Sequence, residues 1–422
     1  MTQTSTSRGM ADLRQKGDPP LTGTRVLDLT QVVAGPYCTT MLADMGAEVV
    51  KLERFGVGDD TRRVQRYEGR EEHEDYFNAS NRCKKSIELD LKDPAHFEVG
   101  QALAAKADVV VENFAPGTAA RLGMAWRDLQ PLNPKLVYCS ISGFGQDGPS
   151  RDRLALDTMT QAVAGMMSVT GFPDCDPVIM GAPLSDVISG MFAAYAVLGA
   201  LFNVARDGEG QYIDVSMQDS LIAALGPRMG EALQAGRSSG RMGNENPIRV
   251  PSDTYRTADG RFINITVVNE RHWAPFCRAI DREDWIDDPR FVDMAARIRH
   301  RADLKEPLVA RFAEETLDDW MSRLDAARVP YAPVNDYAQA LADPQVAHRG
   351  LVREVDHPRS GSINVIAAPW ISTGGSPPIT PPPLLGQHTE EVLESWLGWD
   401  SSAISAFLGS DESEEPNVAT GP

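Results

Sequence analysis

The feature that most constrains the fold of this 422-residue chain is the repeated alternation of apolar strands and helical stretches in its first half. Buried strands are expected at Arg25–Leu29, Gly46–Glu53, Ala107–Asn113, Lys135–Ile141 and Tyr212–Ser216, with a further short strand after Lys84 and Lys85. Strand, helix and strand in repetition predict an open parallel sheet with helices on both faces, a Rossmann-like α/β architecture. Such sheets bind ligands at the carboxyl ends of their strands. Functional residues are therefore expected in the loops after Leu29, Glu53, Asn113 and Ile141.

The second half of the chain changes character and predicts a smaller α+β domain. Phe262–Val268 has the composition of a strand and follows a turn, and tryptophan-containing helical stretches come next. The predicted organisation is a disordered N-terminus (1–20), a large domain (21–226), a linker (227–250), a small domain (251–335), a return to the large domain (336–409) and an acidic, disordered tail (410–422).

Charge and cysteine usage exclude several classes of protein. The net charge of −19 argues against nucleic-acid binding and against anchoring on anionic membranes. The five cysteines contain no CxxC pair, and the seven histidines show no metal-ligand spacing, so neither a disulfide framework nor a metal site is expected. Val187–Ala205 approaches the length of a membrane span but is rich in alanine and is read as a buried helix. A cytoplasmic protein without membrane or nucleic-acid partners is expected.

Asp186 directly precedes this apolar helix and is open to two interpretations. Aspartate is a preferred N-cap, which makes a structural role the simpler one. A carboxylate at a helix N-terminus is also expected to stay ionised, because the helix dipole and free N–H groups favour negative charge there. An ionised carboxylate on a rigid helix is suited to nucleophilic attack.

Cations near the strand ends indicate what the loops bind. A dinucleotide fingerprint is absent, because Gln31–Pro36 does not read GxGxxG. Basic residues cluster instead at four places: Arg54, Arg62 with Arg63, Lys84 with Lys85, and Arg121. In so acidic a chain they favour a small polyanion such as a nucleotide over solvated surface charge, although each cluster alone fits either reading.

Taken together, the motifs resemble the class III coenzyme A transferases, from about Leu21 to Leu397. The matching stretches are Leu27–Pro36, Gly46–Glu53, Asn81–Asp90, Ala107–Gly117, Gly143–Pro149, Gln161–Gly165, Gly181–Gly190 and Pro383–Leu393. The resemblance implies that Asp186 is the nucleophile. It implies that CoA is contacted by Val32, Ala34, Arg54, Asn113, Phe114, Arg121 and Leu122.

The resemblance also implies the reaction and the partners. The expected activity is transfer of CoA from an acyl-CoA to a small carboxylic acid through aspartyl anhydrides and an aspartyl-CoA thioester. The CoA thioester is a substrate, no permanently bound cofactor or metal is needed, and an interlocked homodimer is expected. Arg228, Arg237, Arg241 and Arg249 hint at a dicarboxylate such as succinate.

Departures from the family pattern define the alternatives. In the formyl-CoA:oxalate enzyme of this family, a glutamine helps to shield the acyl-enzyme, and this chain has Val33 at that position, with Gln31 two residues earlier. A lysine of the same enzyme that contacts CoA corresponds to a position near Leu154, where Arg153 could replace it. The related 2-methylacyl-CoA racemases carry a histidine where this chain has Leu156, followed by Asp157. Without that imidazole a racemase is the weaker alternative, as is an inactive CoA-binding protein.

Overall fold

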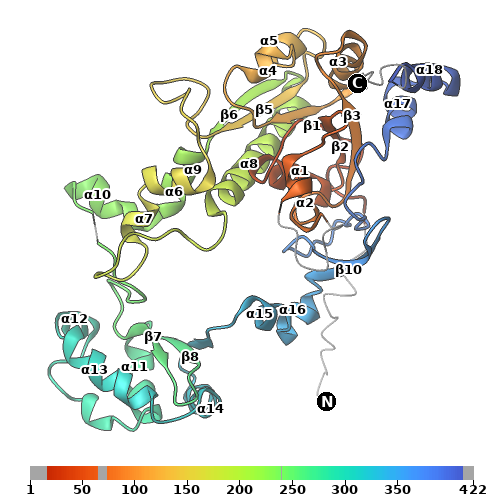
Figure 1. The fold of residues 1–422 in the computed structure, drawn as a ribbon. Coiled ribbons are helices and arrows are strands. Elements are labelled where there is room, and N and C mark those ends of the chain that lie inside the picture. Colours follow the sequence, from red (N-terminus) through yellow and green to blue (C-terminus); the bar gives the residue numbers. More distant parts are fainter. Residues whose placement is uncertain (1–16, 65–73, 239, 412–422) are drawn as a thin grey trace, which may run out of the picture. The chain divides into compact units, whose positions relative to one another are not determined.

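A computed structural model describes residues 17–64, 74–238 and 240–411 of the chain (Figure 1). The chain forms two compact units. The larger unit comprises the chain up to Ala164, residues 181–226 and the chain from Arg349 onward, and the smaller comprises 165–180 and 227–348. Most of the predicted disordered N-terminus and acidic tail lies outside the described residues. The assignment of functional domains to these segments stays a prediction.

A six-stranded, fully parallel sheet forms the centre of the larger unit, as the alternation of segments predicted. The strands are β1 (Arg25–Asp28), β2 (Glu48–Arg54), β3 (Lys84–Leu89), β4 (Val109–Glu112), β5 (Val137–Ser142) and β6 (Gln211–Ser216). Their order is β3-β2-β1-β4-β5-β6. The chain reverses direction across the sheet between β1 and β4, which is the switch point where such folds bind ligands.

Alternate residues of each strand pack into different cores. Val26 and Val109 face helices α1 (Ala34–Asp44) and α8 (Leu184–Asp207), whereas Leu27 and Val110 face α3 (Pro94–Lys106) and α17 (Thr389–Leu397). This two-sided burial explains why a central strand such as β4 reads as a continuous apolar run. The sequence favours a helix at Thr389–Leu397, and α17 confirms it; this helix brings the C-terminal part of the chain back onto the sheet.

Several element boundaries differ from the sequence prediction. The sequence favours a helix at Phe97–Lys106, but α3 begins at Pro94, because Asp93 caps it by accepting hydrogen bonds from the N–H groups of Ala95 and His96. Aspartate followed by proline is a helix-start signal that the prediction overlooked. The sequence also favours a helix at Arg127–Leu132, where the structure has only the single turn α5 (Trp126–Leu129).

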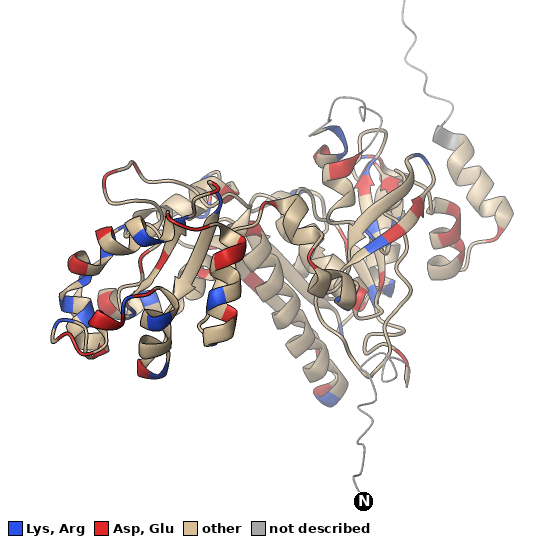
Figure 2. Ribbon diagram, turned by 90° about the horizontal axis from the view of Figure 1, so that it is seen from below, with Lys and Arg blue, Asp and Glu red and all other residues tan. Residues whose placement is uncertain are grey.

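Helix α8 packs closely on α1. A Cβ at Gly190 would lie 2.5 Å from the carbonyl oxygen of Ala34, so only glycine permits this approach. Within the described residues, α8 alone is long and apolar enough to cross a membrane, a test that core helices of soluble proteins also pass. Its charges are confined to Asp186, Arg206 and Asp207, and the helix is almost entirely tan in Figure 2.

The smaller unit is built on an antiparallel sheet of β7 (Ser252–Arg256), β8 (Phe262–Thr266) and β9 (Tyr331–Pro333). Helices α11 (Glu270–Ala279), α13 (Arg301–Phe312) and α14 (Leu317–Ala327) complete its core. The segment 227–250, predicted as a linker, contains the helix α10 (Gly230–Ala235). In the larger unit, the hairpin of β10 (Val352–His357) and β11 (Gly361–Ile366) was not predicted.

Candidate active site

Loops at the carboxyl edge of the parallel sheet enclose a pocket of about 290 Å³ that contains Asp186. The loops after β1, β4 and β5 form its wall together with the first turns of α6 (Asp157–Val163) and α8. Among the lining residues are Val32, Ala34, Asn113, Phe114, Arg153 and Asp157. The structure therefore gathers four of the residues that the resemblance implied for CoA around the implied nucleophile.

A second pocket, of about 420 Å³, follows along the same edge of the sheet. It is lined by Gln31, Arg54, Phe55, Lys92, Phe114 and Leu122, among others. Because Phe114 also lines the first pocket, the two share a wall. Arg121 ends the turn α4 (Thr118–Arg121), where its Nη2 donates to Thr118 Oγ1 at 2.6 Å. A ligand with an apolar ring and phosphates suits this mixture of apolar walls and cations.

Several of the basic residues found in the sequence are internal ion-pair partners rather than ligand-binding groups. Lys84 is buried and its Nζ lies 3.0 Å from Asp28 Oδ2. The buried Arg62 pairs with Glu53 at 2.7 Å and also with Glu74. Reading these two as sites for a polyanion is therefore wrong. Lys84 is buried whereas the next residue, Lys85, is partly exposed, a difference that sequence alone leaves ambiguous.

The N-cap interpretation of Asp186 is also wrong. Helix α8 begins at Leu184, its N-cap is Pro183, and no side chain caps it. Asp186 is thus the third residue of the first turn, and it is half-buried. Its carboxylate is not needed to close the helix, which leaves it available for chemistry.

Asp157 supports the start of α8 instead. Its Oδ1 accepts a hydrogen bond from the N–H of Ser185 at 2.8 Å, and its Oδ2 accepts one from Gln161 Nε2 at 2.7 Å. The hydroxyls of Thr160 and Ser185 lie 2.6 Å apart and add a second link between α6 and α8. These contacts place one carboxylate next to another, since Asp157 and Asp186 line the same pocket.

Burial and the neighbouring charge of Asp157 raise the pKa of Asp186 to about 7. The sequence predicted a carboxylate held ionised by the helix dipole, so the expected direction of the shift is wrong. Desolvation and like-charge repulsion outweigh the dipole here. A carboxyl group that titrates near neutrality in a pocket is a candidate functional group.

Two further acidic or phenolic residues near the pocket carried no signal in the sequence. Glu112 ends β4, and burial raises its pKa to about 7. It accepts hydrogen bonds from the N–H of Phe114 at 2.8 Å and from Ser140 Oγ, which fixes the loop after β4. Burial and the charges of Asp186 and Asp157 raise the pKa of the Tyr76 phenol. Among the described residues, no three His, Cys, Asp or Glu side chains are arranged to hold a metal ion.

Comparison with known proteins agrees on one family. Residues 21–389 match the profile of CoA-transferase family III. A succinyl-CoA:glutarate CoA-transferase from Mus musculus is 38% identical over 94% of this chain and 91% of its own length. A succinate–glutarate CoA-transferase from Agrobacterium fabrum is 36% identical over 89% and 95%. The crystal structure of a CAIB/BAIF family protein from Brucella suis has a TM-score of 0.80 at 32% identity and covers 89% of this chain and 98% of that one.

Proposed function

The chain belongs to CoA-transferase family III, and on this premise we propose that it moves CoA between dicarboxylic acids, with Asp186 as nucleophile. CoA-transferases use CoA thioesters as substrates. The position of Asp186 is the observation that carries the proposal. Its carboxylate does not cap the helix, and it lies in a pocket at the switch point of a parallel sheet. The relatives named for succinyl-CoA, succinate and glutarate support a dicarboxylate as one partner.

The proposed reaction proceeds by four acyl transfers. Asp186 attacks the donor thioester carbonyl, the C–S bond breaks, and an aspartyl–acyl anhydride and CoA thiolate form. The thiolate attacks the aspartyl carbonyl, giving an aspartyl-CoA thioester and releasing the first acid. The acceptor carboxylate attacks the carbonyl of this thioester, the C–S bond breaks, and a second aspartyl–acyl anhydride and CoA thiolate form. Attack of the thiolate on the acceptor acyl carbonyl yields the new acyl-CoA and restores Asp186.

The proposal also assigns the two pockets to the two ends of CoA. The pocket with Arg54, Phe55 and Leu122 takes the nucleotide, and the pocket with Asp186 takes the thioester. Phe114, on their shared wall, lies between them.

A homodimer and a cytoplasmic location belong to the same proposal. Exposed apolar side chains on α8, namely Met191, Phe192, Tyr195 and Phe202, are consistent with a covered face.

A donor–acceptor panel tests the proposed function directly. Succinyl-CoA and glutaryl-CoA are incubated with mono- and dicarboxylic acids, and new thioesters are identified by mass spectrometry. We expect transfer to dicarboxylates.

A parallel incubation of 2-methylacyl-CoA in heavy water tests the racemase alternative. Leu156 has no acid–base group and both Asp157 oxygens are engaged, so no deuterium uptake at the α-carbon is expected.

We propose that Arg153 binds the distal carboxylate of the dicarboxylate. It lines the Asp186 pocket, and its guanidinium lies 5.0 Å from the centre of the Phe144 ring. Within the described part of the chain it has no acidic partner, whereas its neighbour Arg151 faces Asp152 at 3.3 Å. The arginines first considered are less suitable. Arg241 already binds two backbone carbonyls and Arg237 pairs with Glu231.

Arg153→Ala is expected to raise the KM for succinate or glutarate about tenfold, the effect of one lost charge-assisted hydrogen bond at an accessible site. The KM for a monocarboxylic acceptor should stay within about twofold, since it has no distal charge to lose. Arg151→Ala is the matched control and should change neither value much. Steady-state kinetics with both acids measure the ratio. An equal rise for mono- and dicarboxylates would assign Arg153 to CoA instead.

The raised pKa of Asp186 predicts the acid limb of the pH profile. Attack requires the ionised form, so kcat/KM for acyl-CoA should rise with pH through about 7 and be roughly tenfold below its plateau at pH 6. Asp157→Asn keeps an oxygen that can accept from Ser185 but removes the neighbouring charge, and should move the limb to lower pH. Asp152→Asn, in the same pocket, should not. If the acid limb of Asp157→Asn lies at the same pH as that of the parent, repulsion between the two carboxylates is excluded as a cause of the raised pKa of Asp186.

A further inference from the structure

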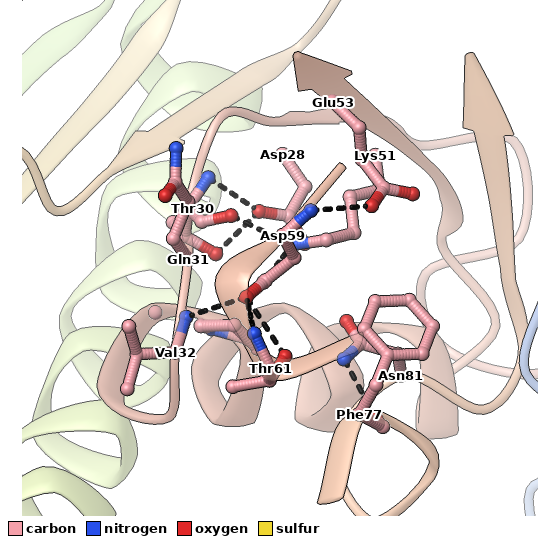
Figure 3. Close-up of polar contacts among 12 residues, drawn as sticks. Asp28, Thr30, Gln31, Val32, Lys51, Glu53, Asp59, Thr61, Phe77 and Asn81 are labelled. Carbon is pink, nitrogen blue, oxygen red and sulfur yellow. Dashed lines mark hydrogen bonds and ion pairs between the residues drawn. The ribbon is translucent and has the colours of Figure 1, made fainter. Parts of the chain in front are cut away.

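We propose that Asp59 is a positioning residue that holds the loop after β1 in the shape required beside Asp186. The inference rests on the proposed function for its kinetic consequence only. It stands on the conformation of Val32 and on the hydrogen bonds that fix it. The close-up in Figure 3 shows these contacts, with Asp59 between Val32, Thr61 and Lys51.

Val32 has an unfavourable backbone conformation. Its φ is +69°, in the left-handed region that β-branched residues rarely enter. The residue is 43% exposed, so packing of the isopropyl group does not enforce this conformation. A strained residue persists where the surroundings determine it, and such residues are frequent at functional sites. The restraint must come from contacts to the backbone.

Side chains from β1 and from neighbouring segments hold the peptides of the loop. Thr30 donates its N–H to Asp28 Oδ1 at 2.8 Å, and its carbonyl accepts from Lys51 Nζ at 2.6 Å. The amide of Asn113 pairs with both the N–H and the carbonyl of Gln31, each at 2.8 Å. Val32 donates its N–H to Asp59 Oδ1 at 3.2 Å. Asp59 thus makes the last of these contacts, at the strained residue itself.

Asp59 is in turn fixed by its own surroundings. It is fully buried, its N–H donates to Glu53 Oε2 at 3.0 Å, and its Oδ1 also accepts from the N–H and hydroxyl of Thr61. Its Oδ2 lies 3.0 Å from Lys51 Nζ, and both of these side chains are inaccessible to solvent. A buried ion pair gives little net stability, so a role in holding one conformation accounts for it better. Asp59 and Lys51 join the loops after β1 and β2.

The held loop leads into the part of the pocket where charge develops. Val32, Val33 and Ala34 line the Asp186 pocket, and α1 begins there without a side-chain cap. In the described chain, no acceptor is present for the N–H groups of Val33 and Ala34. Donors of this kind stabilise an oxyanion only when correctly placed. Rotation of the Gln31–Val32 peptide would displace them from the thioester.

The test compares four variants by kcat and by the Kd for free CoA. Asp59→Ala should lower kcat about 100-fold, the effect of a misplacement near 1 Å, while the Kd for CoA changes less than about threefold. Asp59→Asn retains an acceptor for Val32 and should remain within about fivefold of the parent kcat. Thr61→Val removes a different donor to the same oxygen and should remain within about threefold.

Val32→Gly in the Asp59→Ala background separates positioning from general support of the fold. Glycine adopts a positive φ without steric cost, so the restraint becomes less necessary. The double variant should recover at least about tenfold in kcat relative to Asp59→Ala, a non-additive result. If Asp59→Ala and Asp59→Asn lose activity equally and glycine restores none of it, Asp59 serves only the buried ion pair and the proposal is overturned.

Hydrogen exchange of the peptide covering residues 30–36 gives a result independent of catalysis. Asp59→Ala should accelerate exchange of these amides about tenfold or more, and Thr61→Val should not. If the parent transfers no CoA, the proposed function fails while the exchange experiment still decides the role of Asp59. If Asp59→Ala does not fold, exchange in Asp59→Asn decides: protection like that of the parent is expected, and lost protection overturns the proposal.

Discussion

Asp186→Asn is expected to lower CoA transfer by at least about 1,000-fold, because the amide cannot form an anhydride and the remaining site offers only binding and orientation. Asp186→Ala should behave in the same way, since no cap bond is lost with the side chain. Incubation of the parent with acyl-CoA and hydroxylamine should leave a hydroxamate on the peptide that contains Asp186. Mass spectrometry locates it. Transfer by either variant at rates near the parent's would exclude Asp186 as the nucleophile.

Asp186→Asn should also increase the free energy of unfolding above neutral pH. Because the folded-state pKa of Asp186, about 7, lies above its ordinary value of 3.8, ionisation opposes folding. The penalty is absent below about pH 4, where both states are protonated, and is complete above about pH 7. Since Asp186 is partly solvated, we expect the amide to contribute about 1–2 kcal/mol, well below the full value implied by the shift. Thermal unfolding at pH 8 and pH 4 should show a higher Tm for Asp186→Asn only at pH 8.

The fold follows from the sequence because local signals agree with one another. Strands such as Val109–Glu112 and Val137–Ser142 carry apolar residues at successive positions, which indicates a parallel sheet covered on both sides. The candidate nucleophile follows from the family motif around it. Contacts between distant residues do not follow. Asp59 lies 27 residues from Val32, and Asp157 lies 28 from Ser185, so no local pattern announces either pair.

Charge is the property that sequence alone assigned least well. Arg54 and Lys84 both belong to basic clusters near strands of the same sheet, yet one ends β2 at the surface and the other is buried against Asp28. The upward pKa shift at Asp186 comes first from burial and second from the charge of Asp157, and both depend on the packing of α6 on α8. Burial and partners decide the role of a charge, and both are tertiary properties.

Arg54 and Arg121 are expected to be the main charged contacts of the nucleotide. Arg54 lines the pocket beside Phe55, where it pairs with the exposed Asp60 and the carbonyl of Gly58. Arg121 binds only Thr118 Oγ1 among the contacts of its guanidinium in the described chain. Arg54→Ala and Arg121→Ala should each weaken CoA binding more than about tenfold, since a charge-assisted hydrogen bond to phosphate is lost. Isothermal titration with free CoA measures this without turnover.

Asp60 supplies a control with the opposite sign. Because its carboxylate competes with phosphate for Arg54, Asp60→Asn should tighten CoA binding, whereas Arg63→Ala, on the same loop, should leave it nearly unchanged. The affinity of the parent should also fall as salt is added, and this dependence should weaken in Arg54→Ala. Asp186→Asn should bind CoA like the parent, because it acts on the thioester and not on the nucleotide. If both arginine variants bind CoA as tightly as the parent, the nucleotide lies elsewhere on the protein and the assignment of the two pockets fails.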